Sequence, residues 1–331
     1  MLRAPELLVL DVESLTVPDN AKAHYEKAAA LQYWPLNETA FLPGRIVDPK
    51  HMVQLVVTAK NYGDLFRPLN PADPDYTYIT YIKDLNQHLI ENVSIFLDDD
   101  NQYHGYETIC YRWINDCSFK NEHISVVDFI LKYNDREKTM TYPLLRLLAN
   151  SNPVYIGNTI GGVTLDPPNW PEENTANNTD VILKSAKAVY MVYYLRRDTP
   201  YMKSISDKWE PAFIKEIERL NSSANYPLRL YYMHSESIPD GLTEVVLQVT
   251  PKFVITFILL FVFTMIMMIK VVPADNKLGC RVDLFASKPL AGAYGLVGAT
   301  LAISSSIGLL LICGEPINPM MSITPFLVAC M

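Results

Sequence analysis

Long uncharged runs in the last third of this chain limit what it can fold into more than any other feature. A membrane-spanning helix needs about 20 predominantly apolar residues, and the helices of soluble cores rarely avoid charge for so long. Uncharged residues number 17 in Phe253–Ile269, 26 in Pro289–Gly314 and 16 in Pro316–Met331. The sequence therefore predicts membrane helices at about residues 252–272 and 289–312, followed by a truncated helix at 316–331.

Charge is divided unevenly between the two parts of the chain. Residues 1–251 carry 23 Lys and Arg against 33 Asp and Glu, a net charge of −10, whereas residues 252–331 carry 5 against 3, a net charge of +2. Nucleic-acid binding needs a basic face, so the acidic part argues against a nucleic-acid partner. Lipids of the membrane are the partners expected for the apolar part.

The loop between the first two uncharged runs indicates the orientation of the chain. Short basic loops stay on the cytoplasmic side of a membrane. Four basic residues fall in this loop, namely Lys270, Lys277, Arg281 and Lys288. We therefore expect residues 1–250 to form an exoplasmic domain and residues 251–331 to begin a membrane region, in the plasma membrane or in secretory or endosomal membranes.

Small residues recur every four positions along the second uncharged run. They form two stripes, Ala291, Gly295 and Ala299, and Gly298, Ala302 and Ser306. Small residues at this spacing let helix backbones approach closely, which favours helix association inside lipid. The other interpretation is a helix that is simply rich in small residues, but two stripes favour packing against further helices.

Four glycosylation acceptor triplets agree with this orientation. Single triplets arise by chance, but none of these four lies after residue 221, so all fall in the part expected to be exoplasmic. Their asparagines are Asn37, Asn92, Asn177 and Asn221.

Cysteine placement points to an oxidising compartment. Cys110 and Cys117 are the two cysteines that precede the membrane segments, so they can pair without leaving an odd thiol. His104 and His123 flank them, which makes a zinc site the competing interpretation. The spacing fits no standard zinc pattern, so we predict a disulfide.

Hydrophobic periodicity predicts an α+β fold for the exoplasmic part. Strands are expected at His51–Ala59, Val93–Leu97, Val189–Leu195 and Leu228–His234, with one helix at 74–90 and another capped by Asp207. The second helix would bury one face, formed by Trp209, Phe213, Ile217 and Leu220. Two strand–helix–strand units in succession suggest a ferredoxin-like sandwich, with residues from about 98 to 186 as an insertion.

No pattern of catalytic, metal-binding or cofactor-binding residues emerges from the sequence. Ser235 beside His234 and the acidic turn Asp98–Asp100 are the nearest approaches to a triad fragment or a cation site. Neither has the surrounding residues that such chemistry needs. We therefore expect a protein that is not an enzyme and that has no cofactor.

Several further motifs follow one another along the chain. In the exoplasmic part these are Asp11–Asn20, the Cys110 and Cys117 pair, Tyr155–Val163, Ser185–Ala188, Tyr194–Arg196 and Trp209–Glu210. In the membrane part they are Ser287–Pro289, Ser306–Leu309 and Pro325–Val328. In this order they resemble landmarks of the Patched-related family, part of the resistance-nodulation-division superfamily, and the last three resemble the start of its sterol-sensing region. The set is collinear and covers nearly the whole chain.

This resemblance implies a porter-type exoplasmic domain and a role in moving or sensing sterols or other lipids. Two departures from the family pattern bear on that role. No membrane helix or signal peptide is recognisable before Asp11, and the paired acidic residues expected after Pro325–Val328 are not present. We therefore expect the chain to be part of a longer protein, whose remaining helices and second half would be its partners, and not to be transport-competent alone.

Two other functions remain as alternatives. One is a membrane-anchored receptor or binding domain that transports nothing. The other is a membrane-tethered hydrolase, which would need a nucleophile–base pair that the sequence does not reveal.

Overall fold

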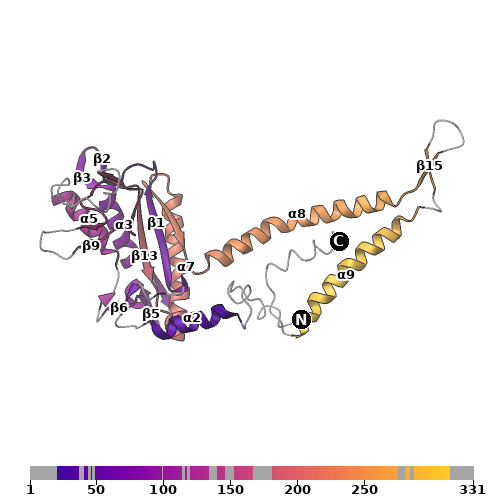
Figure 1. Ribbon diagram of the computed structural model, residues 1–331, viewed down its shortest axis with the longest axis horizontal. Coiled ribbons are helices and arrows are strands. Elements are labelled where there is room, and N and C mark those ends of the chain that lie inside the picture. The colour runs from indigo at the N-terminus through magenta and orange to yellow at the C-terminus, as the bar shows by residue number, and fades with distance from the viewer. Residues whose placement is uncertain are drawn as a thin grey trace, which may run out of the picture. The chain divides into compact units, whose positions relative to one another are not determined.

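A computed structural model describes most of the chain and divides it into two compact units (Figure 1). One unit is Lys27–Ser235, and the other combines Met1–Glu26 with Glu236–Met331. The described residues are 21–36, 41–43, 46, 49–98, 100–113, 116–117, 120–133, 140–145, 153–166, 181–273, 280–283 and 287–313. The expected third membrane helix at 316–331 lies outside them, as do residues 167–178 of the expected insertion.

A four-stranded antiparallel sheet organises the larger unit (Figure 1). Its strands, in spatial order, are β10 (Ile160–Gly161), β13 (Ala188–Tyr194), β1 (Met52–Ala59) and β14 (Leu228–Met233). The sequence predictions of β1, β13 and β14 are confirmed. β13 and β14 both run antiparallel to β1, so they are parallel to each other with β1 between them.

One face of this sheet carries the hydrophobic core. Buried and partly exposed residues alternate along β1, as strand geometry requires. Two helices, α3 (Tyr78–Glu91) and α7 (Pro200–Ser222), contact this face through the fully buried Tyr193. The ring of Tyr193 lies 4.9 Å from that of Phe213 on α7, and its hydroxyl donates to Asn86 Oδ1 of α3 at 2.9 Å.

The second strand expected for a ferredoxin-like sheet is in a different place. Ser94–Leu97 does form a strand, β4, but it pairs with β5 (Gln102–Gly105) in a hairpin, and β10 lies beside β13 instead. A local turn explains the difference, because Asn101 adopts a φ of 57° and Asp100 Oδ1 accepts the Gln102 amide at 3.1 Å. Pairing across such a turn closes a much shorter loop than pairing with β13 would.

The predicted N-cap of α7 is also corrected. The helix begins at Pro200, and Thr199 caps it by accepting the Met202 amide at 3.1 Å, whereas Asp207 lies inside the helix. Proline is well suited to the first helical position, where its missing N–H costs nothing. The buried face is confirmed, since Trp209 and Phe213 are fully buried.

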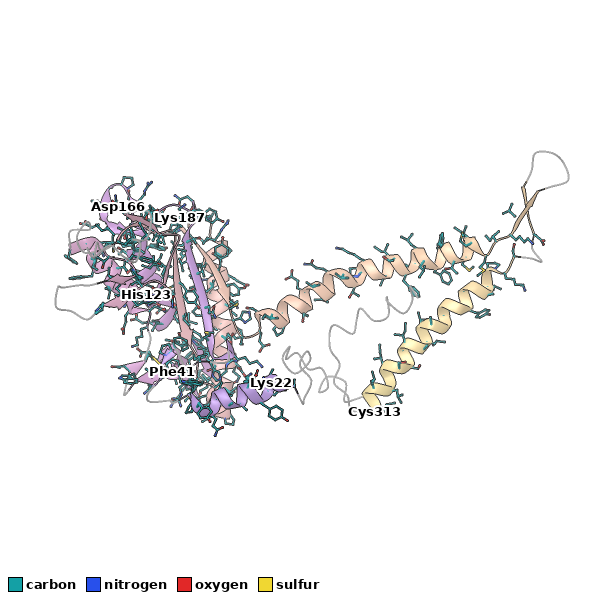
Figure 2. The ribbon with its side chains drawn as sticks, viewed as in Figure 1. Lys22, Phe41, His123, Asp166, Lys187 and Cys313 are labelled. Atoms are coloured by element: carbon teal, nitrogen blue, oxygen red, sulfur yellow. A yellow bond between two sulfur atoms is a disulfide. The ribbon has the colours of Figure 1, made fainter. Side chains whose placement is uncertain are left out.

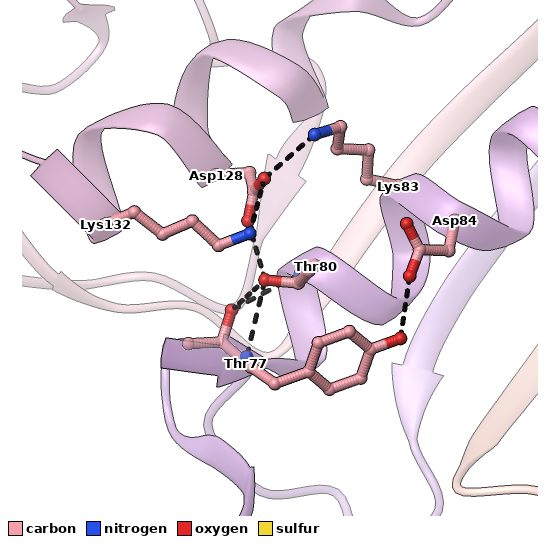
Figure 3. Close-up of polar contacts among 7 residues, drawn as sticks. Thr77, Thr80, Lys83, Asp84, Asp128 and Lys132 are labelled. Carbon is pink, nitrogen blue, oxygen red and sulfur yellow. Dashed lines mark hydrogen bonds and ion pairs between the residues drawn. The ribbon is translucent and has the colours of Figure 1, made fainter. Parts of the chain in front are cut away.

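The inserted segment joins the core through α5 (Glu122–Tyr133), as Figure 3 shows. Asp128 of α5 is 2% exposed. It accepts Thr80 Oγ1 of α3 at 2.6 Å, and its other oxygen lies 3.2 Å from the ammonium groups of both Lys83 and Lys132. Thr80 and Thr77 also cap the start of α3 reciprocally. The insertion is thus held to α3 by a buried, charge-compensated contact.

The inserted segment also completes the outer edge of β13. Asn121 precedes α5 with a φ of 56°, and its Oδ1 accepts the Val192 amide of β13 at 3.0 Å. Its Nδ2 donates to Asn86 Oδ1 at 3.1 Å. A side-chain amide therefore satisfies a strand amide that would otherwise be orphaned.

The remaining elements complete the described structure. The larger unit contains η3 (Pro49–His51), β2 (Pro68–Asn70), β3 (Asp73–Thr77), α4 (Tyr106–Ile109), β6 (Arg112–Trp113), β7 (Asp116–Cys117), β8 (Leu144–Leu145), β9 (Val154–Tyr155), β11 (Thr164–Asp166) and β12 (Ile182–Ser185). The division between the units falls within α2 (Lys22–Tyr33), after Glu26. The smaller unit contains α8 (Ser237–Met267), β15 (Val271–Pro273), β16 (Cys280–Val282) and α9 (Pro289–Cys313).

Trp209 offers a test of this core. Its indole Nε1 donates to the Val93 carbonyl at 3.0 Å, and the side chain is fully buried. We expect Trp209→Phe to lower the free energy of unfolding by about 2–4 kcal/mol, because it removes volume and leaves a buried carbonyl without its donor. Thermal unfolding of the full chain in detergent, followed by circular dichroism, measures this loss.

The control is Trp113→Phe at the half-exposed Trp113 of β6, which should change stability by less than about 0.5 kcal/mol. Equal losses for the two variants would contradict the placement of Trp209 in the core.

Candidate functional site

Two helices of the smaller unit are long and apolar enough to cross a membrane. They are Ser237–Met267 and Pro289–Leu310, and the apolar stretch of neither helix is buried inside the described structure. Figure 2 shows their side chains projecting outward, with Cys313 at the end of α9. The expectation of a membrane protein with spans near residues 252–272 and 289–312 agrees with these two helices.

The first of these helices is longer than a bilayer core requires. α8 begins at Ser237, upstream of residue 252, and has 31 residues. At 1.5 Å per residue it is about 46 Å long, against a hydrocarbon core of about 30 Å. Its uncharged part after Lys252, Phe253–Met267, is long enough to cross most of that core. The residues before Lys252 are therefore available to continue the helix outside it.

α8 and α9 approach closely at Gly292. A Cβ atom at this position would lie 2.9 Å from Thr264 Cγ2 and 3.3 Å from Met268 Cγ. Thr264 lies near the end of α8, and Met268 is its C-cap. Distances this short leave no room for a side chain, so the approach depends on glycine. Sequence analysis missed Gly292 because it belongs to neither four-residue stripe. The signal that could have found it is the three-residue spacing of Gly292, Gly295 and Gly298.

The predicted stripes themselves lie on α9, which contains Ala291, Gly295, Gly298, Ala299, Ala302 and Ser306. A Cβ atom at Gly295 or Gly298 would meet nothing within 4 Å among the described residues. These positions are therefore open in the described helix pair. Their role in packing against further helices stays a prediction.

Hydroxyl groups on α9 bond to the carbonyl groups of their own helix. Thr300 donates to Val297 at 2.8 Å, and Ser304 donates to Thr300 at 2.9 Å. Ser305 and Ser306 both donate to the Ala302 carbonyl at 2.9 Å. A hydroxyl proton that is bonded within the helix can enter hydrocarbon without the cost of an unsatisfied donor. The polar residues of α9 thus do not prevent it from spanning a membrane.

The turn between α8 and α9 is closed by hydrogen bonds. The Lys270 amide donates to Ser287 Oγ at 2.9 Å, and the Lys288 amide donates to the Met268 carbonyl at 3.2 Å. Antiparallel pairing of β15 with β16 continues this closure. The two ends of the basic loop predicted from charge therefore lie side by side, where α8 ends and α9 begins. Lys277 of this loop lies outside the described residues.

An ionic cluster centred on the buried Glu210, here called the exit cluster, lies at the end of β14, where the larger unit ends. It consists of Arg197, Asp207, Glu210, His234 and Ser235. Glu210 of α7 is 3% exposed. One of its oxygens pairs with Arg197, and the other accepts the Ser235 amide at 2.8 Å and lies 3.3 Å from His234 Nδ1. Ser235 Oγ reaches both oxygens at 2.9 Å.

This geometry assigns a structural role to Ser235 and His234. Both side chains are directed at the Glu210 carboxylate, and Arg197 Nη2 also reaches Ser235 Oγ at 3.4 Å. A carboxylate holding the serine hydroxyl does not make it a nucleophile in the way that a neighbouring imidazole base would. The cluster fixes the last residues of the larger unit immediately before α8 begins.

The predicted disulfide is confirmed. Cys110 and Cys117 are linked, with their Cα atoms 5.6 Å apart, and the bond closes the β6–β7 hairpin. The buried Cys110 also bridges to Leu195 at the end of β13, where the Arg196 amide donates to the Ile109 carbonyl at 2.8 Å. The disulfide is thus joined to the segment that leads into Arg197.

The flanking histidines have separate environments. His104 Nε2 lies 2.7 Å from Asp100 Oδ2, which also accepts the Tyr201 hydroxyl. Burial lowers the pKa of His123 to about 4, so this imidazole is neutral at ordinary pH. The two thiols of the competing zinc interpretation are instead used in the disulfide.

Two of the four acceptor asparagines are described. Asn92 caps the C-terminal end of α3 and is exposed, while Asn221 lies in the last turn of α7. Asn92 Nδ2 lies 2.9 Å from His88 Nδ1, and His88 Nε2 lies 2.9 Å from Glu216 Oε1 of α7. Asn37 and Asn177 lie outside the described residues.

Comparison with known families identifies the membrane part. Residues 256–331 match the family model described as Patched SSD. The match begins inside α8 and includes the β15–β16 turn and α9. It therefore coincides with the two candidate spans, the Gly292 approach and the open glycines.

The exit cluster predicts unequal effects of removing the two acids that face Arg197. Glu210→Gln should lower the free energy of unfolding by about 3 kcal/mol, because it leaves a buried guanidinium without its main counter-charge. Asp207, whose side chain is 45% exposed and 3.2 Å from Arg197, is the matched control. Asp207→Asn should cost less than about 1 kcal/mol. Urea unfolding of the full chain measures both values, and equal losses would contradict the cluster.

Acid stability offers a second test, at Glu216. Hydrogen bonding from Arg219, and then from His88, lowers the pKa of Glu216 from 4.5 to about 2. Because the folded state lowers the pKa of Glu216, its ionised carboxylate stabilises the fold above pH 4.5. That stabilisation is lost as the pH falls toward about 2. We expect Glu216→Gln to be less stable than the native chain at neutral pH and equally stable near pH 2. Arg219→Ala should move the loss to higher pH, and unchanged acid unfolding in both variants would refute this assignment.

Proposed function

We propose, since this chain is a Patched-related membrane protein, that it carries a sterol-sensing membrane region which binds a sterol or similar lipid. The membrane region would receive this lipid from an exoplasmic porter-type domain. The observation that carries this proposal is the match of residues 256–331 to Patched SSD, which coincides with the α8–α9 pair.

The chemistry of α9 supports a lipid ligand. Its open glycines and alanines leave a shallow helix surface on which a flat, rigid ring system or another helix can lie closely. The hydroxyls of Thr300, Ser304 and Ser306 are bonded within the helix, yet their oxygens keep a lone pair. Such a surface suits a ligand that is largely apolar and has one hydroxyl group.

The larger unit supports a porter-type assignment. α7 connects β13 to β14, two parallel strands that lie on either side of β1. The helices α3 and α7 lie on the same face of the sheet. β10 occupies the edge position next to β13 that the second strand holds in a ferredoxin-like sheet. The strand order β14–β1–β13–β10 therefore supports the ferredoxin-like assignment, with the strand supplied by the inserted segment.

Three observations favour an exoplasmic location for this unit. The turn after α8 is basic, the acceptor triplets all precede it, and the Cys110–Cys117 disulfide needs an oxidising compartment. Glycosylation follows from that location. The plasma membrane and secretory or endosomal membranes are the compartments that we propose.

The exit cluster holds the last residue of the larger unit in place. Glu210 accepts the Ser235 amide, and α8 begins at Ser237. Alternating access needs two repeats that move around a shared site, so we propose that residues 1–331 alone bind lipid without moving it. A membrane-anchored receptor is the alternative that shares this behaviour.

The Gly292 approach provides the test of lipid binding. The full chain in liposomes is irradiated with a photoreactive sterol, and the labelled residues are mapped by peptide mass spectrometry. We expect labelling of α8 and α9, and we expect Gly292→Leu to remove most of it, because a leucine side chain cannot fit beside Thr264.

Gly308→Leu is the matched control, since a Cβ atom at Gly308 meets nothing within 4 Å among the described residues. It should leave most of the labelling in place. Labelling confined to the larger unit, or unaffected by Gly292→Leu, would contradict the proposed site. Gradient-dependent sterol flux through these liposomes would contradict binding without transport.

A further inference from the structure

Asn221 makes a paired contact that is unusual for a glycosylation acceptor. Its Oδ1 accepts the Leu230 amide of β14 at 2.9 Å, and its Nδ2 donates to the Leu230 carbonyl at 2.7 Å. β14 is the edge strand of the sheet, so this carboxamide covers the free N–H and C=O of one edge residue. The two residues are only nine positions apart, so the contact is local.

The paired contact uses one particular hydrogen of the Asn221 amide. A carboxamide can bond to the N–H and the C=O of one residue only if its oxygen and its nitrogen-bound hydrogen point in the same direction. That hydrogen is the one on the same side of the C–N bond as Oδ1. A glycosylated asparagine is a secondary amide, and secondary amides are trans. In a trans amide the substituent carbon takes this same position, so a sugar at Nδ2 would replace the bonding hydrogen.

Asn92 differs in this respect. Among the described residues its Nδ2 contacts His88 Nδ1 alone, at 2.9 Å, and that contact does not require Oδ1 to point in any particular direction. The other Nδ2 hydrogen can therefore be replaced by a sugar. Asn92 and Ser94, the hydroxyl residue of its triplet, are both exposed.

We infer that Asn92 carries a glycan, whereas Asn221 stays unmodified and acts as a carboxamide bracket on the edge of β14. The inference rests on the proposed exoplasmic location of this unit. It separates two acceptor triplets that are equivalent by sequence, because the folded contact of Asn221 and a glycan on it exclude each other.

Site occupancy in the full chain tests this inference. The chain is expressed in mammalian cells, digested with peptide N-glycosidase in heavy-oxygen water, and mapped by mass spectrometry, which marks each formerly glycosylated asparagine. We expect the mark at Asn92 and none at Asn221. Ser94→Ala, which destroys the first triplet and keeps Asn92, should remove one glycan. Ser223→Ala, which destroys the second and keeps Asn221, should leave the mass of the glycoprotein unchanged apart from the substitution.

A stability measurement tests the bracket independently of the glycan. Asn221→Asp keeps the acceptor but turns a carboxylate oxygen toward the Leu230 carbonyl, so it should lower the midpoint of thermal unfolding. Asn92→Asp, the matched control, should lower it less. These variants are measured on chain produced in a bacterial host, where neither site is modified.

The possible results separate the inference about Asn221 from the proposed exoplasmic location. Glycan on Asn221, or equal midpoints for Asn221→Asp and the native chain, would overturn the inference while leaving the exoplasmic location intact. Absence of glycan from all four triplets would overturn both the exoplasmic location and the assignment of Asn92.

Discussion

The burial of the Glu210 carboxylate is the constraint on which the larger unit depends. A carboxylate at 3% exposure is tolerated only when its charge and its lone pairs are compensated. Here the compensation comes from two separate segments: Arg197 after β13, and His234 with Ser235 after β14. Satisfying this one group therefore determines how the two parallel strands end relative to the helix that connects them. It also determines where the chain leaves the sheet before α8.

The disulfide belongs to the same arrangement. Cys110 bridges to Leu195, and Arg196 bonds to Ile109, so the hairpin closed by Cys110 and Cys117 holds the segment that presents Arg197. The Ser206 hydroxyl of α7 also donates to the Arg196 carbonyl at 2.7 Å. Insertion, sheet and helix thus converge on Leu195–Arg197. The insertion is therefore part of the fold, as the contacts of Asn121 and Asp128 also indicate.

Sequence reasoning succeeded where a single local pattern decides the outcome. Alternation along β1, the face of Trp209 and Phe213 on α7, cysteine parity and the uncharged runs all depend on residues close in sequence. It failed where the outcome depends on a choice between partners. The pairing of β4 with β5 is set by a turn at Asn101, and the start of α7 by Thr199 and Pro200, which compete with Asp207 as a cap. Gly292 escaped because its importance comes from Thr264, on a helix distant in sequence.

The central proposal is that this chain, whose residues 256–331 match Patched SSD, has its acidic α+β unit outside the membrane and its basic turn inside the cell. Variants with a single free thiol test it most directly, in a background where Cys280, Cys313 and Cys330 are replaced by serine and the Cys110–Cys117 disulfide is kept. Tyr103→Cys reports on the larger unit, where Tyr103 is 74% exposed, and Lys288→Cys reports on the turn after α8. A membrane-impermeant maleimide is applied to intact cells that display the chain at their surface. The account predicts that the Tyr103→Cys variant is labelled at once and the Lys288→Cys variant only after permeabilisation. Equal labelling of both variants in intact cells, or labelling of the Lys288→Cys variant alone, would contradict it.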